Sequence, residues 1–121
     1  MIKQMPGNAG NERLEEKRRF ERIDIASYGM VEVLGEKDKK LGMLRQLARG
    51  GFSMETDTPY HKDSKVHLFA IVDPGEGIRA EVKARVRFVD TSLVGFEFVD
   101  LNAAAAVEIG IIIGKYYEHS K

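Results

Sequence analysis

Two arginines, Arg18 and Arg22, stand at the spacing RxxxR and are the side chains of this sequence most suited to holding an anionic ligand. A guanidinium group presents a rigid fork of N–H donors to phosphate oxygens and purine edges, and its plane stacks on bases. Two such groups at this spacing can close around one flat, anionic ligand. The alternative is an i,i+4 pair on a charged, solvated helix with Glu15 and Glu21 as neighbours. We favour the ligand site because of the pattern that follows the arginines.

The composition is that of one ordinary globular domain without a strong charge. The sequence has 121 residues, of which 19 are Lys or Arg and 19 are Asp or Glu, so its formal net charge is zero. A chain of this length can bury a core without covalent staples. The neutral balance argues against a protein that coats DNA or an anionic membrane, so we expect no nucleic acid polymer as a partner. The absence of cysteine excludes disulfides and thiolate metal sites.

No segment of the sequence has the pattern of a signal peptide or a membrane span. Residues 1–8 lack the apolar stretch that a signal peptide needs. The longest apolar stretch, residues 103–114, is interrupted by Glu108 and is too short to cross a bilayer. We therefore expect a cytoplasmic protein without membrane insertion.

The chain divides into an N-terminal arm and one domain. Residues 1–12 are polar and contain one proline and two glycines, which predicts a flexible arm. We expect the domain to span residues 13–118. Its first segment, residues 13–22, is mostly charged and forms either a short exposed helix or an extended lead-in.

The strand signal is strongest between residues 79 and 89. Charged side chains alternate there with apolar ones that we expect on one face: Ala80, Val82, Ala84, Val86 and Phe88. A period of two is the signature of a half-buried antiparallel strand. After a polar turn at residues 90–92 the alternation resumes with Val94, Phe96 and Phe98, which predicts a hairpin.

Further strands precede this hairpin. One is predicted by the apolar residues Val66, Leu68, Ala70 and Val72, and it leads into strong turn chemistry at residues 73–77. Two more candidates span residues 23–33 and 41–56, with a polar turn between them at residues 35–40. Short strands with polar turns indicate an all-β fold, a small barrel or sandwich, because closing a sheet removes its exposed edges.

A helix is predicted at the C-terminal end, over residues 101–118. Asn102 is a suitable N-cap, and four alanines follow it. Isoleucines favour strands, and Gly110 and Gly114 weaken a helix, but the alanine run favours a helical start. The apolar residues occupy more than one face, so one face can pack on the barrel and another can meet a partner subunit. A homodimer through residues 103–117 is therefore one hypothesis.

Three features together resemble the PilZ domain family. They are the RxxxR pair, the strand that carries Gln46-Leu47-Ala48-Arg49-Gly50-Gly51, and the closing Val94-Gly95-Phe96-Glu97-Phe98-Val99-Asp100. The resemblance covers about residues 14–117. It implies a six-stranded antiparallel barrel with a C-terminal helix, and a bacterial signalling domain that binds the second messenger cyclic di-GMP.

The resemblance also assigns candidate site residues. In the family, the RxxxR arginines contact guanine edges and phosphates, which here implies Arg18 and Arg22. The family's second motif, Asp/Asn-x-Ser-x-x-Gly, falls on Gln46, Ala48 and Gly51, and only the glycine is retained. Gln46 keeps an amide but is one methylene longer, and Ala48 has no side-chain hydrogen bond to offer. Two such losses would weaken binding by roughly ten- to a hundredfold.

Two arginines and a glycine pair beside the altered motif could also contribute to a ligand site. Arg45 and Arg49 flank the motif and are candidates for compensating phosphate contacts. The Gly50-Gly51 pair can allow a ligand to approach the backbone, or it can be a turn that the barrel itself requires.

Two functional hypotheses follow, and neither is catalytic. The first is a cyclic di-GMP sensor or adaptor that signals to a protein partner. The second is a degenerate PilZ-like module that does not bind the dinucleotide and acts through protein–protein contacts of its barrel face or C-terminal helix. A plain β-barrel unrelated to cyclic nucleotides is a third interpretation. No Ser-His-Asp arrangement, Walker loop or HExxH sequence is present, so we expect no enzyme. The three histidines are scattered, so we expect no metal site and no cofactor.

Overall fold

The structure is a computed structural model that describes residues 23–25 and 30–120, with side chains described up to residue 117. Its elements are β2 (Ile23–Asp24), β3 (Glu32–Leu34), the 3-10 turn η1 (Glu36–Asp38), β4 (Lys40–Ala48), β5 (Gly51–Thr56), β6 (His67–Asp73), β7 (Ile78–Asp90), β8 (Leu93–Phe98) and the helix α2 (Ala103–Ser120). The predicted arm over residues 1–12 and the segment that carries Arg18 and Arg22 lie outside the described residues.

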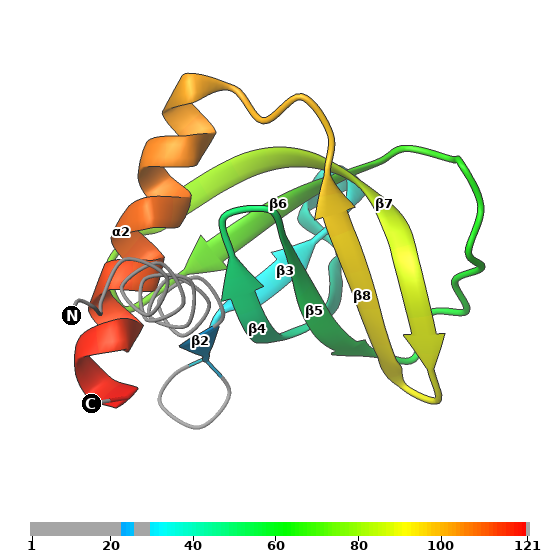
Figure 1. The fold of residues 1–121 in the computed structure, drawn as a ribbon, viewed down its shortest axis with the longest axis horizontal. Helices are drawn as coiled ribbons and strands as arrows, with labels where there is room; N and C mark the ends of the chain where they lie inside the picture. The colour runs from blue at the N-terminus through cyan, green and yellow to red at the C-terminus, as the bar shows by residue number, and fades with distance from the viewer. Residues whose placement is uncertain (1–22, 26–29, 121) are drawn as a thin grey trace, which may run out of the picture.

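The strands form a closed antiparallel barrel with one helix beside it (Figure 1). The ring runs β3-β4-β5-β8-β7-β6 and returns to β3, and each of these six strands pairs with two neighbours. The short β2 pairs with β4 beyond the part of β4 that pairs with β3. The predicted fold, a six-stranded antiparallel barrel with a C-terminal helix, is confirmed. Closure leaves no long unpaired strand edge in the ring.

The first two strand candidates are both divided in the structure. The candidate over residues 23–33 is β2 and β3, which pair with successive parts of β4. The candidate over residues 41–56 is wrong as a single strand, because a turn at Arg49 and Gly50 divides it into the hairpin of β4 and β5. The glycine pair therefore marks a hairpin, and Gly51 is already the first residue of β5.

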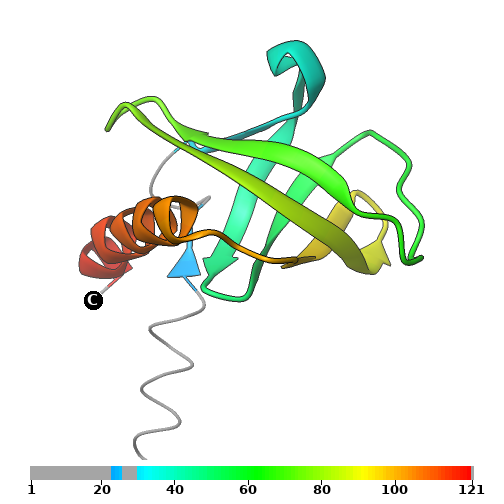
Figure 2. The ribbon, with the colours of Figure 1, turned by 90° about the horizontal axis from the view of Figure 1, so that it is seen from above.

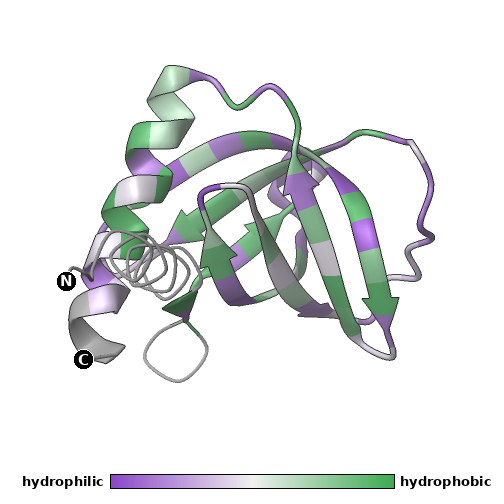
Figure 3. Ribbon diagram, viewed as in Figure 1, coloured by the Kyte–Doolittle hydropathy of each residue, from purple (hydrophilic) through white to green (hydrophobic). Residues whose placement is uncertain are grey.

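The alternation along β7 is confirmed for its first part only. Ala80, Val82, Ala84 and Val86 are buried in the barrel, and Figure 3 shows polar and apolar residues alternating along this strand. The alternation predicts Phe88 on the same face, but Phe88 is 44% exposed. The register against β8 shifts between Val86 and Phe88, so the bulge turns Phe88 to the outside.

The inward face of β6 differs from the predicted apolar set. Leu68 is 67% exposed, whereas its neighbours Phe69 and Ile71 are buried. The strand pairs Phe69 with Val82 and Ile71 with Ala80, so the core-facing register of β7 also fixes the face of β6. Of the four apolar residues that predicted this strand, Val66 precedes β6, Leu68 is exposed, Val72 is partly buried and Ala70 is buried.

Aromatic rings fill one end of the barrel. The ring of Phe52 stacks on Phe96 at a centroid distance of 5.0 Å, and Phe69 meets Phe96 edge to face at 5.0 Å. Tyr60 and His67 extend this cluster from the loop before β6 and from its first residue. Burial, with the nearby charge of Lys65, lowers the pKa of His67, while Asp63 opposes the shift. These rings fix which face of β5 and β8 points into the barrel.

The C-terminal helix begins as the sequence indicates. The Asn102 side-chain oxygen accepts a hydrogen bond from the Ala105 N–H at 2.8 Å, which confirms the predicted N-cap. The helix lies along one side of the barrel (Figure 2), where it packs against β7, β2 and β4. Its buried residues are Ala105, Ile109, Ile112, Ile113 and Tyr116. No helix among the described residues is both long and apolar enough to cross a membrane.

A buried carboxylate joins the helix to the turn between β6 and β7. Asp73 is 2% exposed, and its Oδ2 accepts hydrogen bonds from Lys115 Nζ at 3.1 Å and from the Tyr116 hydroxyl at 3.3 Å. Its Oδ1 accepts from the Gly75 N–H at 3.1 Å. Burial alone would lower the pKa of Lys115, but its hydrogen bonds to Asp73 and Tyr116 outweigh burial and raise that pKa. Every polar atom of this cluster therefore has a defined structural partner.

Candidate functional site

A hollow among the described residues lies on the outer face of the barrel. Its volume is about 480 Å³, and it spans the hairpin of β4 and β5 and the ends of β7 and β8. The lining residues are Gln46, Leu47, Ala48, Gly50, Gly51, Phe52, Ser53, Arg87, Phe88, Gly95 and Phe96. Three residues proposed from the sequence, Gln46, Ala48 and Gly51, are therefore brought together at one site. We call this hollow the outer-face pocket.

The strand register arranges the pocket in two rows. In the first row Gln46 faces Ser53 across β4 and β5, Ser53 faces Gly95, and Gly95 faces Phe88. Successive residues of a strand point to opposite faces, and the neighbours Leu47, Phe52, Met54, Val94 and Phe96 all point into the core. The first row is therefore on the outer surface.

The second row lies beside the first along the strands. Ala48 faces Gly51, Gly51 faces Glu97, and Glu97 faces Arg85. The Arg85 guanidinium lies 3.7 Å from the Glu97 carboxylate, so this ion pair borders the row at the β7 side. Between them, the two rows give a floor of small residues with larger polar and aromatic side chains at its edges.

Two glycines keep the floor low, and each has a packing reason. A Cβ at Gly51 would collide with the backbone carbonyl oxygen of Phe96 on the neighbouring strand. A Cβ at Gly95 would collide with the ring of Phe88, which lies over that glycine. A Cβ at Gly50 would meet only open space. Close approach of the strands therefore explains Gly51 within the barrel itself, whether or not a ligand also uses it.

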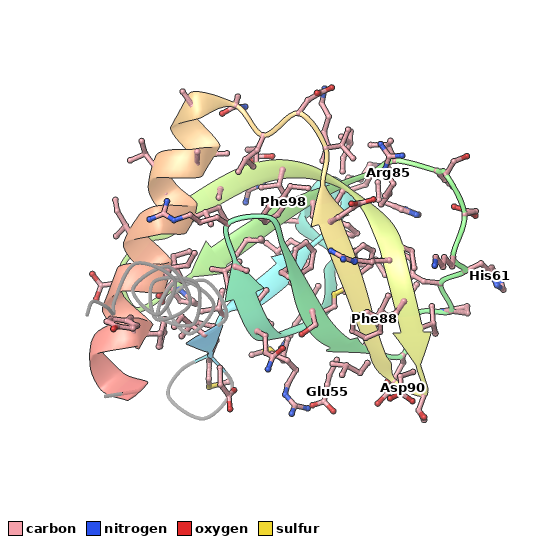
Figure 4. The ribbon with its side chains drawn as sticks, in the orientation of Figure 1. Glu55, His61, Arg85, Phe88, Asp90 and Phe98 are labelled. Atoms are coloured by element: carbon pink, nitrogen blue, oxygen red, sulfur yellow. The ribbon has the colours of Figure 1, made fainter. Side chains whose placement is uncertain are left out.

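The edges of the pocket are an amide, an aromatic ring and a guanidinium. Gln46 is exposed at the β4 edge, and Phe88 and Arg87 are exposed at the β7 edge. Figure 4 labels Phe88, which comes from β7 and lies across β8. An amide can donate and accept hydrogen bonds, and an exposed ring can stack on a planar group. The arrangement fits a flat ligand with a hydrogen-bonding edge.

The two flanking arginines proposed from the sequence have different positions. Arg45 occupies the bulge in β4, where its Nη1 lies 3.3 Å from Glu55. Arg49 extends towards the helix, with its Nη1 3.8 Å from the point where Gly110 would carry a Cβ. Neither residue lines the outer-face pocket. Their proposed role in compensating phosphate contacts gains no support from this geometry.

The chain enters the barrel beside the pocket. Ile23 pairs with Leu47 and Asp24 pairs with Gln46, so β2 runs next to the altered motif. Arg22 directly precedes Ile23 in the sequence, and Arg18 lies four residues earlier. The described part of β2 thus lies beside the altered motif, and Arg18 and Arg22 are outside the described residues.

Among the lining residues that sequence reasoning did not propose for the site are Ser53, Arg87, Phe88 and Gly95. Ser53 and Gly95 each stand between two buried apolar residues, so the period of two already placed them on the outer face. A glycine inside a strand also signals close approach of other atoms. The orientation of Phe88 depends on the bulge in β7, which has no comparable sequence signal.

Within residues 23–25 and 30–120, no group of three or more His, Cys, Asp or Glu side chains is placed to hold a metal ion. His61 and His67 lie in the described part and His119 has no described side chain.

A closed six-stranded barrel with one C-terminal helix and a hollow on its outer face defines a small β-barrel domain. The sequence model of the PilZ domain matches residues 16–113. The chain therefore belongs to the PilZ domain family.

Solved structures with the same fold include two PilZ domains. One is the PilZ domain of CeSA from a cellulose-synthesizing bacterium, with 17% sequence identity, a TM-score of 0.53, and coverage of 78% of this chain and 91% of that chain. The other is the PilZ domain of YcgR from Escherichia coli with c-di-GMP, with 13% identity, a TM-score of 0.58, and coverage of 82% and 90%. A search of the curated proteins found no match.

Proposed function

We propose that this PilZ domain is a non-catalytic receptor or adaptor that binds cyclic di-GMP at the outer-face pocket and signals to a protein partner in the bacterial cytoplasm. Family membership supports the proposal, as does the fold shared with a domain whose structure was solved with c-di-GMP. The observation that carries it is the gathering of Gln46, Ala48 and Gly51 in one pocket beside the entry of β2.

The roles of the residues follow from the chemistry of the ligand. A cyclic dinucleotide has two anionic phosphates and two planar bases. Arg18 and Arg22 supply charge-assisted hydrogen bonds to phosphates and guanine edges, which are the strongest contacts of the site. Gln46 offers its amide to a base edge, Gly51 allows close approach, and Ala48 lines the floor without a hydrogen bond.

Calorimetric titration of cyclic di-GMP into the purified protein tests this proposal. We expect saturable binding by the wild type and its loss in the double variant Arg18→Ala/Arg22→Ala. Arg19→Ala is the matched control, since it removes a neighbouring arginine that is outside the RxxxR spacing. Absence of heat from the wild type, or equal affinity of the double variant, would contradict the proposal.

A second candidate function is supported by the surface of α2. Val107 is 61% exposed and Ile111 is 50% exposed, one turn apart on the face that does not meet the barrel. Apolar residues in this arrangement suit a protein–protein contact, either with a partner or with a second copy of the chain. Light scattering at high protein concentration separates these two cases, because a mass equal to one chain would remove the homodimer.

We also propose that residues 13–118 form the folded unit and that residues 1–12 are an appended arm. The family match over residues 16–113 lies within these bounds. Limited proteolysis that leaves a stable fragment beginning near residue 13 would agree with this division.

A further inference from the structure

We propose that Ser53 supplies the ligand-binding hydroxyl that Ala48 lacks, so that the site replaces the family's serine by one on the neighbouring strand. This inference rests on the proposed function and deepens it, because it names a residue that determines affinity at the same site.

The position of Ser53 follows from the alternation of β5. Phe52 and Met54 are 5% and 0% exposed and belong to the core, so the side chain between them must point outwards. Ser53 nevertheless is only 6% exposed, because it lies at the floor of the outer-face pocket. It is thus a buried side chain on the outer surface of the barrel.

The hydroxyl of Ser53 is unused by the fold. It makes no hydrogen bond to any residue that the structure describes, whereas the other two buried polar residues of the described chain, Thr56 and Asp73, both do. The fully buried side-chain N and O atoms without a hydrogen-bond partner in the described chain are Arg45 Nε and Arg85 Nε, and the Ser53 hydroxyl is not among them. The hydroxyl is therefore still open to the pocket although the residue as a whole is buried. A ligand at the pocket would give this hydroxyl its partner.

Ser53 is also close to both positions of the altered motif. It faces Gln46 directly, and residues that face each other across antiparallel strands have Cβ atoms about 5 Å apart. It stands diagonally from Ala48, which faces Gly51, and such diagonal neighbours are about 7–8 Å apart. A planar base lying on the floor is wide enough to contact positions 46, 48 and 53. A hydroxyl at position 53 can therefore bind the same ligand from the adjacent strand.

The neighbours of Ser53 leave that hydroxyl accessible. Gly95 faces it on β8 and Gly51 precedes it by two residues on the same face of β5. Neither glycine carries a side chain that could cover the serine, and both are held as glycine by close packing. The open floor and the hydroxyl are therefore parts of one arrangement.

The experiment is a calorimetric titration of cyclic di-GMP into four proteins: wild type, Ser53→Ala, Ala48→Ser and the double variant Ser53→Ala/Ala48→Ser. We expect Ser53→Ala to weaken binding by about three- to tenfold, the loss of one hydrogen bond. Adding Ala48→Ser to that variant should restore most of the affinity, because the hydroxyl returns to the family's position. Ser64→Ala, in the exposed loop before β6, is the matched control and should leave affinity unchanged.

The outcomes separate this inference from the proposed function. A wild type that binds with the same affinity as Ser53→Ala overturns the role of Ser53 and leaves the receptor function in place. A wild type that does not bind at all overturns both. Restoration by Ala48→Ser also shows that Ser53→Ala did not act by damaging the fold.

Discussion

Polar side chains are hydrogen-bonded within the protein around Asp73, whereas in the outer-face pocket the Ser53 hydroxyl is not. At the junction of the helix with the β6–β7 turn, both carboxylate oxygens of Asp73 accept hydrogen bonds from named donors. In the pocket, Ser53 is almost as buried, yet its hydroxyl has no partner among the described residues. The first region is complete as a structure, while the second has hydrogen-bonding capacity left for a ligand.

The glycines show the same contrast. Gly75 next to Asp73 donates its N–H to the carboxylate, so its backbone is part of a closed turn. Gly51 and Gly95 instead leave an open floor between Gln46 and Phe88. The pocket thus offers room and a hydroxyl to a ligand, whereas the groups around Asp73 are already bonded to one another.

The largest expected effect is on the structural side. Asp73→Ala removes a buried acceptor and leaves Lys115 with Glu76 as its remaining ion-pair partner at 3.4 Å. We expect a loss of about 2–4 kcal/mol in the free energy of unfolding, because the donors that hydrogen-bond to Asp73 lose a buried acceptor. Urea denaturation followed by circular dichroism measures it. Asp57→Ala, at an exposed loop aspartate, is the control, and equal stability of the two variants would refute a structural role for Asp73.

The next effect concerns the floor of the pocket. Gly51→Ala places a Cβ against the Phe96 carbonyl oxygen, so β5 and β8 must separate locally. We expect a loss of about 1–3 kcal/mol in the free energy of unfolding, typical of overpacking. Gly50→Ala is the matched control, because its Cβ meets open space. If both alanines are equally tolerated in a thermal melt, packing does not explain Gly51 and its role is confined to the ligand.

A smaller effect sharpens the ligand side. Gln46→Asp/Ala48→Ser restores the carboxylate and hydroxyl of the family motif on the edge and floor of the pocket. Because Ser53 already supplies a hydroxyl, the gain should come mainly from the carboxylate at position 46, and binding of cyclic di-GMP should tighten about tenfold without a matching change in stability. Titration calorimetry measures the affinity. A double variant that binds no better than the wild type would indicate that the wild-type pocket already satisfies the ligand in another way.

The parts of this molecule that sequence predicted are those set by local pattern. The buried residues of β7 from Ala80 to Val86 follow a period of two, and Asn102 caps the helix through its own side chain. The resemblance to the family placed Gln46, Ala48 and Gly51 in one site, and the pocket contains all three.

The parts that sequence did not predict depend on register between strands. The bulge after Val86 turns Phe88 outwards, and no local signal marks it, since both conformations suit the same residues. The pairing of β6 with β7 decides which side chains of β6 point into the core, so Leu68 is outside although it is apolar. Ser53 became visible as a site residue only when its strand was placed between Gln46 and Gly95.

The central claim, that the outer-face pocket binds the ligand and the helix junction does not, is tested most directly by amide chemical shifts. Cyclic di-GMP would be titrated into ¹⁵N-labelled protein, and the shifts of every assigned amide followed. We predict the largest changes at residues 46–53 and at Phe88 and Gly95, with little change at Asp73, Gly75 and Lys115. Changes concentrated on α2 and the β6–β7 turn, or no changes at saturating ligand, would contradict the account.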